Sequence, residues 1–221
     1  MNRYPSLPYI APFAVFMGFV ALHSILPLPD LADQIVRLVV VAAVLVFVSR
    51  PVIDLRVTHL LATCAVGAGV FILWIAPDLL LPHYREFWLF SNSVTGAARS
   101  TLSEAGRHDT AVLLLRSVRA VIIVPVVEEL FWRGWMMRWL IRQDFERVPL
   151  GAYTAGAFWA VAVLFASEHG PYFDVGLIAG AAYNWWMVRT RSLGDLILAH
   201  AITNGLLCAY VIFAGKWEYW L

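Results

Sequence analysis

The stretch VIIVPVVEELFWRGW, at residues 121–135, places two glutamates and an arginine inside a segment that otherwise has the character of a lipid-buried helix. An ionised side chain at the centre of a bilayer costs at least about 2.5–3.5 kcal/mol on insertion scales. Glu128, Glu129 and Arg133 stand within six residues, so this cost arises three times in less than two helical turns. Such charges persist only where they are compensated or used. The stretch therefore indicates an intramembrane enzyme rather than a passive membrane protein.

The rest of the chain has the composition of a polytopic membrane protein. Of 221 residues, 61% are hydrophobic and 14% are charged, whereas soluble domains carry about 25% charged residues. A membrane-spanning helix needs about 20 mainly apolar residues. By this measure the sequence predicts an all-α transmembrane bundle of about seven spans, in a range of roughly six to eight. They fall at residues 8–28, 35–53, 58–81, 111–141, 151–170, 172–190 and 194–214.

Two features interrupt this pattern. The segment 82–109 is polar, and part of it, residues 93–107, has helical composition, so we expect an interfacial amphipathic helix or a substrate-access loop. Pro125 lies inside the long apolar region, where a proline can kink or break a helix because it lacks the backbone donor. No repeat or linker divides the chain. We therefore expect one membrane-embedded domain, 1–221, with the motif-bearing core at about 110–210.

Three pairs of residues four apart carry the polar groups of the apolar helices. They are Glu129 with Arg133, Phe165 with His169, and His200 with Asn204. Residues four apart lie on one helix face, and polar groups in lipid almost always face the bundle interior. Six side chains from three spans are therefore expected to converge on one wet cavity: Glu128, Glu129, Arg133, His169, His200 and Asn204.

Five of the six residues also have a purely structural explanation. Glu129 and Arg133 can form an ion pair without any catalytic role, and an intramembrane histidine or asparagine can hydrogen-bond a neighbouring helix. Glu128 is different, because Arg133 is five residues along and better placed for Glu129. A buried carboxylate without a compensating charge readily takes up a proton, as a general base must.

In this order and spacing, the three pairs resemble the CAAX protease and bacteriocin-processing (CPBP, or Abi) family of intramembrane glutamate proteases. The resemblance covers roughly residues 110–210, and no motif position departs from the family pattern. The flanking residues 131–134 and 198–199 are similar to that family as well. The chain length and the Ser-Glu-His-Gly sequence at residues 167–170 further resemble a bacterial subgroup found beside exosortase protein-sorting systems.

The resemblance implies a role for each residue. Glu128 would activate water with the help of His169, and His200 and Asn204 would stabilise the oxyanion of a tetrahedral intermediate. Glu129 and Arg133 would be supporting residues. The family implies a mechanism without a metal cofactor, although one carboxylate and two histidines can also form an open zinc site.

Together these features predict a multi-pass endopeptidase of the bacterial inner membrane. Its expected partners are the lipid bilayer and a membrane-anchored protein or peptide, cut near its C-terminal anchor, whereas nucleic acid is not expected because no basic patch is present. The alternative is a membrane protein that is not an enzyme. A proton-coupled transporter also uses intramembrane Glu and His, and an immunity protein can sequester a peptide.

Overall fold

In the computed structural model, which describes residues 4–23, 25 and 28–220, the described chain is helical and contains no strand beyond an isolated bridge between Asn92 and Gly96. The longer helices are α1 (Leu7–Leu22), α2 (Asp30–Val44), α3 (Leu60–Leu80), α8 (Ala155–Ser167), α9 (Phe173–Thr190) and α10 (Leu193–Ala214). One further rod consists of α5 (Thr110–Val118), η4 (Arg119–Ile123), α6 (Val124–Glu129), η5 (Leu130–Met136) and α7 (Met137–Ile141). Helix α2 continues through η1 (Leu45–Ser49) and η2 (Arg50–Val52).

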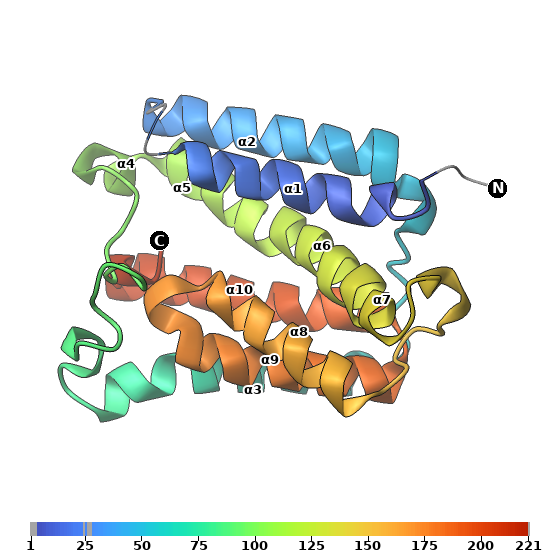
Figure 1. Cartoon of the computed structure of the whole chain (residues 1–221). Helices are drawn as coiled ribbons and strands as arrows, with labels where there is room; N and C mark the ends of the chain where they lie inside the picture. Colours follow the sequence, from blue (N-terminus) through green and yellow to red (C-terminus); the bar gives the residue numbers. More distant parts are fainter. Residues whose placement is uncertain (1–3, 24, 26–27, 221) are drawn as a thin grey trace.

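The rods run back and forth along the bundle (Figure 1). Helices α1 and α2 form one layer, α3, α8, α9 and α10 form another, and the rod from α5 to α7 runs obliquely between them. Four rods of the described chain are long and apolar enough to cross a membrane: Asp30–Val52, Leu60–Leu80, Thr110–Ile141 and Leu193–Ala214. Helices α1 and α8 are shorter and apolar. The prediction of a polytopic helical bundle is confirmed.

Close packing of small residues holds α10 against α3. A Cβ on Gly67 of α3 would lie 2.5 Å from the backbone oxygen of Ala199, so only glycine allows this approach. The Thr203 hydroxyl donates to the Gly67 carbonyl at 2.8 Å across the same contact. Small residues and interhelical hydrogen bonds are the usual means of helix association in lipid. This contact places His200 in the interior.

The polar segment 82–109 gathers at the end of the bundle where α10 ends (Figure 1). It is helical only at η3 (Tyr84–Glu86) and α4 (Glu104–His108), so most of the segment is non-helical and no long amphipathic helix forms there. The Asn92 side chain accepts from the amides of Val94 and Thr95, and this turn competes with helix formation. Helix α4 starts only where the Ser103 hydroxyl caps the Gly106 amide.

Candidate active site

Pro125 shapes the rod that carries Glu128 without breaking it. The preceding turn, η4, is π-helical, and the Val124 amide donates to the Arg119 carbonyl five residues back. The next carbonyl, Ala120, would need the amide hydrogen of residue 125, which proline lacks. The Asn204 side-chain nitrogen donates to this Ala120 oxygen at 2.8 Å. The proline thus leaves an acceptor that ties α10 to the rod.

Glu129 lies at the centre of a fully buried polar network, with none of its surface exposed. Arg133 Nη1 lies 3.1 Å from Glu129 Oε2, and His200 Nδ1 lies 2.7 Å from Glu129 Oε1. Arg133 also donates to the Asn184 side-chain oxygen at 2.8 Å. The His200 ring stacks on Tyr183, with centroids 4.9 Å apart. Glu129 and Arg133 therefore hold the position and orientation of His200.

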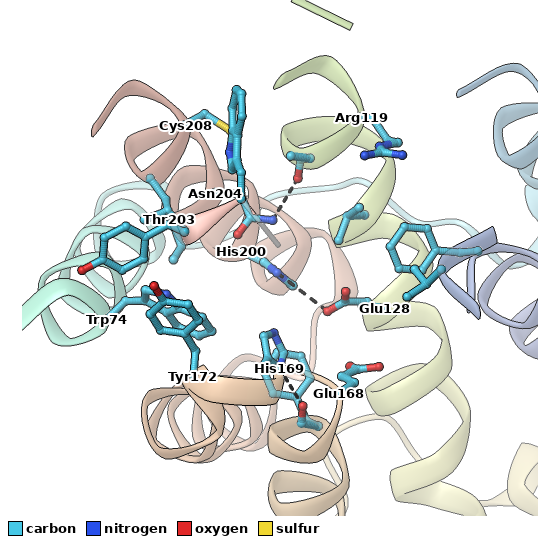
Figure 2. Close-up of a pocket in the computed structure, with 18 of the residues that line it drawn as sticks. Trp74, Arg119, Glu128, Glu168, His169, Tyr172, His200, Thr203, Asn204 and Cys208 are labelled. Atoms are coloured by element: carbon cyan, nitrogen blue, oxygen red, sulfur yellow. Dashed lines mark hydrogen bonds and ion pairs between the residues drawn. The ribbon is translucent and has the colours of Figure 1, made fainter. Parts of the chain in front are cut away.

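Glu128 has a different environment from its neighbour in sequence. Its Oε2 lies 3.9 Å from His200 Nε2, and no described residue makes a hydrogen bond to that oxygen, although it is buried. Figure 2 shows the Glu128 carboxylate facing His200 and His169 across a pocket. A carboxylate oxygen with an unused lone pair at a cavity can accept a hydrogen bond from a water or substrate group.

His169 follows the last turn of α8. Its Nδ1 lies 2.7 Å from the Phe165 carbonyl, which can only accept, so Nδ1 carries the proton. In the neutral ring Nε2 is then an acceptor. The imidazole packs between the Phe165 ring, at 4.7 Å, and Trp74 of α3, at 5.2 Å. Phe165, four residues before His169, therefore contacts it in two ways: its carbonyl accepts from Nδ1, and its ring packs against the imidazole.

A second carboxylate, Glu168, lies in the same pocket, and the sequence reasoning did not include it. Trp132 Nε1 donates to Glu168 Oε1 at 2.9 Å, and Figure 2 places the Glu168 side chain beside Glu128. The sequence signal was an acid directly before His169, at the end of an apolar helix. The pairing with Trp132 depends on how α8 packs against the rod.

These groups line a cavity of about 310 Å³. Of the six residues that the sequence brought together, four line it: Glu128, His169, His200 and Asn204. Glu129 and Arg133 lie behind His200, outside the lining. Among the residues described, no three His, Cys, Asp or Glu side chains are grouped so as to hold a metal ion. The cavity thus combines carboxylates, two imidazoles and an amide with apolar walls.

Comparison with known proteins gives one finding. Residues 110–206 match the model of the family described as Type II CAAX prenyl endopeptidase Rce1-like. This match includes every predicted site residue and both carboxylates of the cavity. Among curated proteins and solved structures, nothing matches the chain.

Proposed function

Because residues 110–206 identify the chain as a member of the CAAX protease family, we propose that this membrane endopeptidase cleaves by water activated at Glu128. The observation that carries the proposal is the unbonded Glu128 Oε2 in a cavity that also contains His169 and His200. A general base must reach the proton that it removes, and this oxygen has a lone pair free to accept a hydrogen bond from water.

In the proposed reaction, Glu128 takes a proton from water while the water oxygen attacks the carbonyl carbon of the scissile bond. The carbonyl electron pair moves to oxygen and forms the oxyanion. His169 orients the water through Nε2, since its Nδ1 is held by the Phe165 carbonyl. When the intermediate collapses, the carbon–nitrogen bond breaks and the proton held on Glu128 passes to the leaving amine.

His200 and Asn204 are proposed to stabilise the oxyanion. Asn204 uses one amide hydrogen on the Ala120 carbonyl, which leaves its second hydrogen for the cavity. His200 donates from Nε2 only as an imidazolium, because Nδ1 is engaged with Glu129. The Glu129 carboxylate holds the Nδ1 side of the His200 ring, and Arg133 keeps that carboxylate in place. Preorganised donors of this kind account for about 10²–10³-fold in rate.

The proposed substrate is a membrane-anchored protein or peptide, cut near its C-terminal anchor in the bacterial inner membrane. The apolar walls of the cavity, which include Phe16, Trp74 and Phe165, suit a lipid-embedded segment. Four long apolar rods and two shorter apolar helices support a membrane protein, in which such a substrate would be found. A role in protein sorting is the finer proposal, and it would make the product an exported protein released from its anchor.

Comparative proteomics of a Glu128→Gln strain tests the proposal. We expect one or more membrane proteins to accumulate uncut. Each would keep a C-terminal segment that is removed in the wild-type strain. The matched control is Glu104→Gln, a change at an exposed glutamate of α4 outside the cavity, which should leave the membrane proteome unchanged. Identical proteomes in all three strains, with the Glu128→Gln protein present at wild-type level, would remove the support for Glu128 as the base.

A further inference from the structure

The catalytic cavity continues along the rod toward two arginines. Arg116 and Arg119 line it together with Trp220, and Arg119 precedes Glu128 by nine residues. At 1.5 Å per residue this corresponds to roughly 13 Å along the helix. Arg119 also lines a smaller cavity of about 160 Å³ next to α2. Figure 2 shows Arg119 on the same ribbon as Glu128 and well separated from it.

Arg119 is a buried cation without a described partner. Its side chain is only 8% exposed, yet no hydrogen bond or ion pair joins it to any residue in the described part of the chain. Other buried arginines are engaged: Arg37 with Asp33 at 2.7 Å, Arg133 with Glu129, and Arg138 with the Gly134 carbonyl at 2.6 Å. An arginine inside a membrane-spanning helix is costly and is normally paired or functional.

The acids that face Arg119 are already in use. Helix α2 contributes Asp33, which binds Arg37, and Asp30, which accepts from the Ser103 hydroxyl at 2.5 Å. The side of α1 that lines the cavity contributes only apolar residues, Phe16, Met17 and Val20. On the α10 side, the Asn204 amide is directed to the Ala120 carbonyl. The planar guanidinium fork therefore remains available for a ligand, and it matches the geometry of carboxylate and phosphate oxygens.

We propose that Arg119 binds an anionic group of the substrate, a carboxylate or a phosphate, at the end of the cavity remote from the reacting bond. This inference rests on the proposed function and specifies which substrates the site selects. An extended peptide advances about 3.3 Å per residue, so roughly four residues separate the scissile bond from the anion. The anion is either the C-terminal carboxylate of the peptide or the phosphate of a lipid headgroup. Arg119 is a specificity residue in both cases.

Binding measurements on the full-length Glu128→Gln protein in detergent test this without any need for cleavage. The probes are N-acetyl-tetraleucine with a free carboxylate, the same peptide as its C-terminal amide, and dodecyl phosphate. We expect one of the two anions to bind, and Arg119→Met in the same background to weaken it by at least about 10-fold, as for loss of a charge-assisted hydrogen bond. The amide should bind weakly and without dependence on Arg119. If the affinity for the peptide carboxylate depends on Arg119, the natural ligand is the peptide C-terminus. If the affinity for dodecyl phosphate depends on Arg119, the natural ligand is a lipid headgroup.

Controls keep the outcome clear. Arg142→Met removes an exposed arginine near the end of the same rod and should change no affinity. Arg119→Lys keeps the charge but loses the fork, and should bind with intermediate affinity; it also serves where Arg119→Met does not fold. If neither the peptide carboxylate nor dodecyl phosphate binds the Glu128→Gln protein in a way that Arg119→Met weakens, the proposal is overturned. The proposed protease function is tested by a different measurement, cleavage by the wild-type protein, so its failure can be distinguished from failure of the Arg119 proposal.

Discussion

Two buried carboxylates in this bundle, Asp195 and Glu128, have opposite environments. Asp195, in the first turn of α10, accepts hydrogen bonds from the amides of Thr58 and His59 and from the hydroxyls of Thr58 and Thr63. It ties the start of α3 to the start of α10. Glu128 faces a cavity, and one of its oxygens receives no hydrogen bond from the described residues. Burial is similar at the two positions, and hydrogen bonding differs.

The difference teaches that burial alone does not mark a catalytic acid. A carboxylate that accepts several hydrogen bonds is stabilised as a structural anion and has no lone pair left for chemistry. Glu129 belongs with Asp195 by this criterion, although it is adjacent to Glu128 in sequence, because Arg133 and His200 occupy its oxygens. Substitutions at the two kinds of site should therefore separate activity from stability.

The largest separation is expected at Glu128. In purified protein, Glu128→Gln should lower the cleavage rate by about 10²–10⁴-fold, the usual contribution of a general base. Glutamine keeps the size of the side chain and no described residue hydrogen-bonds the Glu128 Oε2 that it replaces, so the unfolding midpoint in detergent should change little. Rates against the substrate identified by proteomics and unfolding curves provide the two measurements. Retained cleavage, or a large loss of stability, would place Glu128 in the same class as Asp195.

Arg133→Met should have the next largest effect, mainly on stability. It leaves Glu129 as a buried charge without its arginine and removes the donor to Asn184. Breaking one side of a buried ion pair costs about 3–5 kcal/mol. Chemical unfolding in detergent measures the change, with Arg142→Met as the exposed control, for which a shift within about 0.5 kcal/mol is expected. Wild-type stability in Arg133→Met would mean that the Glu129 network is not structural.

Asp195→Asn tests the opposite side of the comparison. The amide keeps the shape but loses the charge and one acceptor, so the free energy of unfolding should fall by about 1.5–3 kcal/mol. Cleavage per folded molecule should remain at the wild-type level, because Asp195 does not line the cavity. Thr63→Val, which removes one of the donors to Asp195, should act in the same direction with a smaller loss. A specific loss of turnover in well-folded Asp195→Asn would break the distinction.

The smallest effect is expected for Trp132→Phe, which tests whether the hydrogen bond from Trp132 to Glu168 contributes to cleavage. The change removes the 2.9 Å hydrogen bond to Glu168 and keeps an aromatic ring in the core. Loss of one hydrogen bond corresponds to about 1 kcal/mol, or roughly a fivefold lower cleavage rate if Glu168 contributes to positioning. Trp185→Phe, at a half-exposed tryptophan of α9, is the matched control. Equal cleavage rates in the two variants would show that the hydrogen bond to Glu168 does not contribute to cleavage.

Several features followed from the sequence alone because they depend on short-range periodicity. Apolar runs of membrane length predicted the helical bundle, and spacings of four predicted which polar groups share a helix face. The sequence left a helix and a loop open for segment 82–109, and most of 93–107 is not helical because Asn92 and Ser103 bond to local amides, a competition that composition does not reveal. Pro125 was ambiguous for the same reason: its effect depends on which carbonyl loses a donor and on what approaches that carbonyl.

The sequence by itself determined that charged and polar groups occur on several apolar helices, since hydropathy and helical spacing are properties of neighbouring residues. Only the tertiary structure decided how these groups are paired: His200 with Glu129, Asn204 with Ala120, and Glu168 with Trp132. Each of these contacts joins residues more than thirty positions apart, so it depends on how the rods cross and rotate. That packing places Glu128 and Arg119 in one cavity. Within the described part of the chain, neither Glu128 Oε2 nor the Arg119 guanidinium has a hydrogen-bond partner. For this reason the proposal for catalysis rests on Glu128 and the proposal for specificity rests on Arg119.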